Sequence, residues 1–121
     1  MSRRSCEATK ADQDRSNSNP MKYFLCKLTG PRPTFPQDIT PREAEIMQAH
    51  TAYCGELLRA GKAVVFGPVA DTAGVWGLGV LQLDDDADPQ DVIANDPVVK
   101  ADAGFVYQVI PMLRAATRET C

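Results

Sequence analysis

The sequence predicts an α+β fold, a ferredoxin-like β-α-β-β-α-β plait with an antiparallel sheet. Three observations predict it: one long amphipathic segment with clear helix start and stop signals, four short segments rich in branched and aromatic residues, and a brief second helical segment before the last of them. This order of elements is that of the split βαβ arrangement. A chain of 121 residues suits one such domain.

The first strand is predicted over 22–28, where the sequence KYFLCKL is rich in aromatic and branched residues. A loop follows over 29–39, because prolines interrupt regular backbone hydrogen bonding. The prolines of this loop are Pro31, Pro33 and Pro36. The chain therefore reaches its first helix through an irregular connection.

The long helix has the strongest signal in the chain. Thr40 is a candidate N-cap, Pro41 occupies the first helical position, and Glu43 completes a capping box of the form T-x-x-E. Gly61 provides the stop signal. The apolar side chains of this helix fall within about 140° of arc, and His50 lies near the centre of that arc.

A hairpin with a long connection is expected next, with strands over 63–66 and 75–83. Gly67 and Pro68 follow the first of these strands, and a turn is expected over 71–74. A glycine at a strand end also lets a ligand approach the backbone closely. Gly67 and Pro68 therefore form either a simple turn or part of a binding site.

The second helix is expected to begin after Asp88, an N-cap candidate, and to break at Pro97. The last strand is predicted over 105–112. The first and last strands are apolar on both faces, so we expect them to be the two central strands. Because the helices cover only one face of the sheet, we expect a second copy of the chain to cover the other face, as a homodimer.

Residues 1–20 differ in composition from the rest of the chain. They contain every serine and no aromatic residue. Such a segment buries too little apolar surface to offset the entropy that is lost on ordering. We therefore expect 1–20 to be a disordered N-terminal extension and 21–121 to form the domain.

Charge and hydropathy argue against two classes of partner. The formal net charge of −3 does not suit a nucleic-acid-binding surface. No apolar run approaches the roughly 18–20 residues of a membrane span, and no apolar stretch of a signal peptide follows the N-terminal arginines. We expect a cytoplasmic protein whose partners are its own copy and a small-molecule ligand, without nucleic acid or membrane.

The residue inventory narrows the possible chemistry. A single histidine excludes any site that needs two, and the lack of serine beyond position 18 excludes a serine-nucleophile triad within the domain. Glycine motifs for phosphate or dinucleotide binding are absent, as is H-E-x-x-H. The four cysteines show no C-x-x-C spacing, which favours reduced thiols.

His50 is the main candidate for chemistry, because an imidazole pKa of about 6.5 suits proton transfer at neutral pH. The alternative is a half-buried core histidine with one hydrogen bond. Asp96 precedes Pro97 and is an N-cap candidate, whose second carboxylate oxygen would be free to orient the imidazole. Asp71 is a rival partner for His50, or simply a turn residue.

We expect no metal and no other cofactor. His50, Cys54 and Asp96 offer three possible metal ligands, but without a recognisable spacing. One short domain also provides little to enclose a haem on His50. Trp76 is either part of the hairpin core or a platform for a ligand.

Five motifs, taken in this order, resemble the YCII-related (YciI-like) family over about 21–114. They are Gln48 to Tyr53 with Gly61, Phe66 to Asp71, Gly74 to Gly77, Asp96-Pro97, and Gly104-Phe105 with Pro111-Met112. The resemblance implies the dimeric α+β barrel form of the plait and an active site with a histidine from the first helix and an aspartate from the D-P motif. These positions are His50 and Asp96. A few relatives are linked to lyase-type or dehydrochlorinase chemistry on ring compounds. The chain departs from the family in its short second helix and its serine-rich extension.

Together these observations predict a cofactor-independent enzyme that transfers protons on a small organic molecule, as a lyase or isomerase. His50 would be the acid/base, and Asp96 would fix its tautomer. The residues assigned to substrate binding are Tyr53, Phe66, Gly67, Pro68, Asp71 and Trp76. The alternative is a non-catalytic dimeric module that binds or senses a small ligand.

Overall fold

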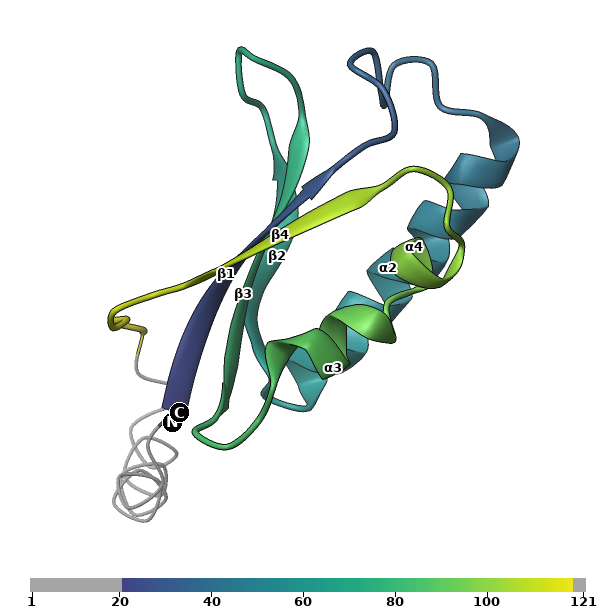
Figure 1. The fold of residues 1–121 in the computed structure, drawn as a ribbon. Coiled ribbons are helices and arrows are strands. Elements are labelled where there is room, and N and C mark those ends of the chain that lie inside the picture. The colour runs from purple at the N-terminus through teal and green to yellow at the C-terminus, as the bar shows by residue number, and fades with distance from the viewer. Residues whose placement is uncertain (1–20, 119–121) are drawn as a thin grey trace, which may run out of the picture.

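The computed structural model describes residues 21–118, and its elements follow the predicted order (Figure 1). The predicted extension, 1–20, lies outside these residues. The elements are β1 (Met21–Thr29), α2 (Pro41–Arg59), β2 (Ala63–Val69), β3 (Trp76–Asp84), α3 (Pro89–Ala94), α4 (Pro97–Lys100) and β4 (Val106–Pro111). The second helical region is thus two short helices, because the proline that opens α4 ends the preceding turn.

The four strands form one antiparallel sheet in the order β2-β3-β1-β4. The two central strands are therefore β1 and β3, and the prediction that the last strand is central was wrong. β4 pairs only with β1. β4 is apolar on both faces. Tyr107 and Val109 pack against the core, whereas Val106 and Ile110 lie on the opposite face and are 60% and 40% exposed.

The capping box that opens α2 is confirmed. The backbone N–H of Glu43 donates to Oγ1 of Thr40 at 3.2 Å, and the Thr40 N–H donates back to the Glu43 carboxylate at 3.0 Å. Two of the donors that a helix start leaves unpaired are satisfied in this way. At the other end, Gly61 has a φ of 75°, a conformation that glycine adopts without strain.

All three helices lie on one face of the twisted sheet (Figure 1). Phe24 and Cys26 of β1 pack there with Leu81 and Leu83 of β3. Val98 of α4 is only 1% exposed. Side chains that alternate with these residues along the strands point to the other face. The core is therefore a single layer between the sheet and the helices.

β2 continues through Gly67 and Pro68 to Val69, beyond the predicted end at 66. A proline is tolerated there because β2 is an edge strand, whose outer N–H groups have no ladder partner. The predicted turn is present, since the N–H of Gly74 donates to the carbonyl of Asp71 at 2.9 Å. Gly67 and Pro68 therefore belong to the sheet rather than to the turn.

The sheet face opposite the helices carries a group of apolar side chains beside the polar Lys27, Gln82 and Gln108, and none of the helices in residues 21–118 covers it (Figure 1). Val65 of β2 is 45% exposed, and Val106 and Ile110 of β4 extend the same surface. Leu25 and Val80 lie between them on the central strands. We call these residues the open sheet face. Among the described helices, none combines the length and the hydropathy that a membrane crossing requires.

Candidate active site

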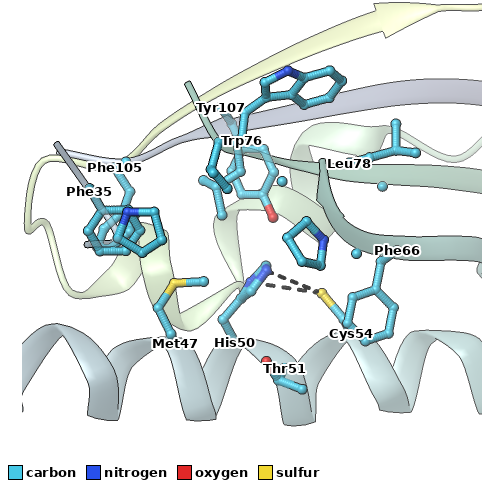
Figure 2. Close-up of a pocket in the computed structure, with 18 of the residues that line it drawn as sticks. Phe35, Met47, His50, Thr51, Cys54, Phe66, Trp76, Leu78, Phe105 and Tyr107 are labelled. Atoms are coloured by element: carbon cyan, nitrogen blue, oxygen red, sulfur yellow. Dashed lines mark hydrogen bonds between the residues drawn. The ribbon is translucent and has the colours of Figure 1, made fainter. Parts of the chain in front are cut away.

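A cavity of about 310 Å³ lies between α2, the loop over 30–39 and the strands β2 and β3 (Figure 2). Its walls are almost entirely apolar. Phe35 of the loop meets Phe105 edge to face, with ring centroids 5.4 Å apart, and Phe66 forms part of another wall. His50 and Cys54 line the helical side. A pocket with apolar walls and few polar groups is the usual form of a small-molecule site.

Two glycines of β3 leave space for this cavity. Gly77 and Gly79 pair with Leu28 and Cys26, which face the helices, so a side chain at either glycine would point into the same layer. A Cβ on Gly79 would come no closer than 3.8 Å to Cys26, which is an ordinary contact. Close packing of the core therefore does not demand a glycine here, and its absent side chain leaves sheet backbone exposed to the cavity.

The predicted pairing of His50 with Asp96 is confirmed. Nδ1 of His50 lies 3.0 Å from Oδ1 and 2.9 Å from Oδ2 of Asp96. The two residues are 9% and 2% exposed. Asp96 is also the N-cap of α4, since Oδ1 accepts the N–H of Val98 at 3.0 Å. The N-cap position thus holds the carboxylate rigidly opposite the middle of α2.

Tyr107 completes the environment of this carboxylate. Its hydroxyl donates to Oδ2 of Asp96 at 2.7 Å. Burial, followed by the charge and the hydrogen bond of Asp96, raises the pKa of Tyr107, so its hydroxyl keeps its proton. Asp96 therefore accepts from a helix backbone, a strand side chain and a helix side chain at once. These donors satisfy the polar atoms of the buried carboxylate.

The carboxylate also sets the tautomer of His50. An ionised carboxylate can only accept, so Nδ1 of His50 carries a proton and donates it to Asp96. Nε2 is the ring nitrogen left for other partners. Figure 2 shows His50 projecting from α2 toward the cavity, with Cys54 beside it. The Cys54 Sγ lies 3.7 Å from Nε2 and 3.8 Å from Nδ1, distances that make only a weak contact.

The pKa of His50 is raised to about 9. Burial is the largest single influence and lowers the pKa, but the hydrogen bonds with Asp96 and Cys54 and the charge of Asp96 together outweigh it. At neutral pH the pair is therefore an imidazolium and a carboxylate. His50 then presents an Nε2–H donor rather than a free base.

The predicted substrate-binding residues are divided between the cavity and other places. Phe66, Gly67, Pro68 and Trp76 line the cavity, and Tyr53 and Asp71 do not. The Tyr53 hydroxyl donates to the carbonyl of Val92 at 2.7 Å and so ties α2 to α3. A role in substrate binding stays a prediction for all six residues, of which four line the cavity.

Asp71, the rival partner for His50, lies at the turn between β2 and β3. It accepts from the N–H of Ala73 at 2.9 Å and from Nε1 of Trp76 at 3.0 Å. These donors lower the pKa of Asp71. The Lys27 ammonium lies over the Trp76 ring, 5.0 Å from its centroid. The indole of Trp76 is therefore held by two surface groups, away from the imidazole.

Sequence reasoning did not find two features of the site. One is Tyr107, although its place on the helix-facing side of β4 implies a buried hydroxyl that needs an acceptor. The other is Arg32, whose guanidinium binds both Glu43 oxygens at 2.7 Å and 2.8 Å and also Asp38 at 2.9 Å. Arg32 ties the loop that carries Phe35 to the start of α2, and it lowers the pKa of Glu43 to about 2.

His50, Cys54 and Asp96 each place one possible metal-ligand atom within 4.8 Å of the others. The hydrogen bonds of the cluster fit a proton network better than a cation. Both oxygens of Asp96 already accept, and Nδ1 of His50 is already a donor. A cation bound by all three side chains would have to replace these bonds and the imidazole proton.

The comparisons with known proteins agree with this architecture. A search of curated proteins found no match. The YCII-related domain family matches residues 21–113, which span every strand and helix of the structure. The resemblance drawn from the sequence motifs is thereby confirmed. With its antiparallel ferredoxin-like sheet and three helices on one face, the chain belongs to the YCII-related domain family, whose fold is the dimeric α+β barrel.

Proposed function

We propose that this protein is an enzyme that transfers protons on a small organic molecule, with lyase or isomerase chemistry. His50 is the acid/base, and Asp96 orients it and fixes its tautomer. The observation that carries this proposal is the environment of the imidazole: a buried carboxylate occupies Nδ1, and the ring lines an apolar cavity. This is the arrangement that general acid–base catalysis requires of a histidine.

The resting charges suggest the order of the steps. Because the pKa of His50 is about 9, the imidazolium first donates its Nε2 proton to an oxygen or a leaving group of the substrate. The imidazole is then neutral and takes a proton from a carbon of the same substrate, which restores the imidazolium. Asp96 keeps the hydrogen bonds that Val98 and Tyr107 donate to it, so its carboxylate stays in place through both steps.

We also propose that the working unit is a homodimer in which the open sheet faces of two copies cover each other. Support comes from the apolar side chains on that face, including Val65 and Val106, which are 45% and 60% exposed. A small domain has a limited core of its own, so burying this surface adds stability. The family assignment points the same way.

A ligand-binding module without catalysis is the second candidate function. The raised pKa of His50 favours it, because an imidazolium that keeps its proton well above neutral pH can hold a ligand without releasing that proton. The two functions differ in whether a proton moves to and from carbon.

Hydrogen–deuterium exchange at carbon separates these functions. The full chain is incubated in D₂O with a panel of small ketones, lactones and β-substituted acids, and exchange next to the carbonyl is followed by NMR. We expect exchange with at least one class, reduced by about 10²-fold or more in His50→Gln. Glu45→Gln, an exposed change on the same helix, should keep the wild-type rate. If His50→Gln exchanges as fast as the wild type, the acid/base role is wrong.

A further inference from the structure

The cavity offers a ligand one cationic group. Among the described residues that line it, His50 has the only basic side chain. Two nearby cations are engaged elsewhere. Lys27 lies over the Trp76 ring at 5.0 Å, and Arg32 is bound to Glu43 and Asp38. A bound molecule can therefore meet one positive charge here, and not two.

The polar groups around His50 leave that charge available at one atom. Asp96 already accepts from Nδ1, from the N–H of Val98 and from Tyr107. The Tyr107 hydroxyl already donates its hydrogen bond to Asp96, so it is not a free donor for a ligand. Nε2 of His50 is thus the charged donor that remains, and among the hydrogen bonds of residues 21–118 its partner is the Cys54 sulfur, at a weak 3.7 Å.

The shape of the cavity restricts the rest of the ligand. Phe35, Phe66 and Phe105 supply aromatic walls, and the two glycines of β3 leave flat backbone between them. Flat apolar rings fit beside aromatic side chains and bare sheet backbone better than branched or polar groups. A volume of about 310 Å³ suits one or two fused rings with small substituents.

We propose that the ligand of this site is a singly charged organic acid with a flat, apolar body, whose carboxylate or phenolate oxygen accepts the Nε2–H of His50. A phosphate monoester is excluded because its second negative charge would be buried without a partner. A neutral amide of the same shape loses the charge-assisted hydrogen bond. This inference rests on the site proposed above, but it concerns binding and needs no turnover.

Three probes of one shape test the charge preference: 2-naphthoate, 2-naphthamide and 2-naphthyl phosphate. Their affinities for the full chain are measured at pH 7 by isothermal titration calorimetry. We expect 2-naphthoate to bind at least about tenfold more tightly than the other two, the ratio typical of a charge-assisted hydrogen bond. Equal affinities, tighter binding of the phosphate, or no binding of 2-naphthoate at millimolar concentration would overturn the proposal.

Two variants test whether the preference for 2-naphthoate over 2-naphthamide arises at His50 and inside the cavity. His50→Gln should bind 2-naphthoate and 2-naphthamide equally, and a preference that survives in this variant contradicts the proposal. Since His50→Gln can weaken the fold, Gly79→Val provides a second test. A Cβ at this position has only Cys26 within 4 Å, and the valine methyl groups reduce the space of the cavity, so the affinity for 2-naphthoate should fall at least about tenfold. Unchanged binding by Gly79→Val would place the acid outside the cavity and overturn the proposal.

Gly55→Ala is the matched control. Gly55 lies on α2 outside the cavity, and a Cβ there would meet only the Arg59 side chain, at 3.5 Å. This variant should keep the wild-type affinity for 2-naphthoate. The outcome is also separable from that of the proposed function. If the protein prefers 2-naphthoate but catalyses no exchange at carbon, the inference about the ligand holds and the proposed enzymatic function is wrong. If it catalyses exchange but does not prefer 2-naphthoate, the proposed function holds and the inference about the ligand is wrong.

Discussion

Tyr107 and His50 share one oxygen atom: Oδ2 of Asp96 accepts the tyrosine hydroxyl at 2.7 Å and lies 2.9 Å from Nδ1 of the histidine. One residue comes from the edge strand β4 and the other from the middle of α2. The carboxylate between them caps α4. Three elements, of which α2 is distant in sequence from the other two, therefore meet at one buried carboxylate, and the basicity of the imidazole depends on all of them.

Replacing Tyr107 by phenylalanine removes one donor from Asp96. The carboxylate then attracts the imidazolium more strongly, so we expect the pKa of His50 to rise above its wild-type value. Loss of the buried hydrogen bond should lower the free energy of unfolding by about 1–2 kcal/mol. NMR titration of the imidazole and chemical denaturation measure the two effects. Tyr53→Phe is the matched control, because its hydroxyl is bound to Val92 and not to Asp96. A fall in the His50 pKa in Tyr107→Phe would show that the shared oxygen does not control it.

Replacing Asp96 by asparagine keeps a side-chain oxygen for the N-cap but removes the charge. Burial then acts on the imidazole without its main opposing partner, and we expect the pKa of His50 to fall from about 9 to near or below its ordinary value. The asparagine amide can donate to Nδ1, which moves the proton of the neutral ring to Nε2. Nitrogen chemical shifts of the labelled imidazole would reveal both changes. An unchanged pKa would mean that Asp96 is not the cause of the shift.

The stability of the fold should depend on pH through His50. Its folded pKa of about 9 lies above the unfolded value of 6.5, so its contribution is complete below about pH 6.5 and is lost as the pH rises through about 9. The full difference is on the order of 3 kcal/mol. The measurement is the free energy of unfolding of the wild type minus that of His50→Gln, between pH 6 and pH 9. This difference should decrease steadily, and an increase would contradict the ion pair.

The open sheet face predicts the oligomeric state. Light scattering should give a mass twice the 13.2 kDa of one chain. Val106→Glu places a charge on the open sheet face and should yield the monomer, because an unpaired charge is costly to bury between two sheets. Leu113→Glu, a change at a fully exposed position outside the strands, should leave the mass unchanged. A wild type that is monomeric at micromolar concentration would rule out the sheet-to-sheet dimer.

Local signals in the sequence predicted the elements well. Thr40, Glu43 and Gly61 act on their immediate neighbours, so the bounds of α2 depend on residues within it or directly beside it. The N-cap position of Asp96 was predictable for the same reason. Its pairing with His50, across 46 positions, needed the family resemblance in addition.

Other features depend on contacts that composition does not encode. Apolar residues on both faces of β4 predict a central strand, but β4 is an edge strand whose Val106 and Ile110 face away from the helices and are exposed. The alternation of side chains along β4 predicts that Tyr107 faces the helices, but it does not predict that the hydroxyl reaches Asp96. The proline-rich loop over 29–39 gives no sign that Phe35 turns inward or that Arg32 fastens it to α2.

Gly77 and Gly79 of β3 affect the size of the cavity more than the stability of the fold. At Gly79 a Cβ can be added without displacing the core, because the nearest atom to it is an ordinary 3.8 Å away. The buried group of His50, Asp96 and Tyr107 belongs to α2, α4 and β4 and does not include this position. Under the proposed function, related proteins can therefore accept larger or smaller substrates by changing one or two residues of β3, while they keep the His50–Asp96 pair unaltered.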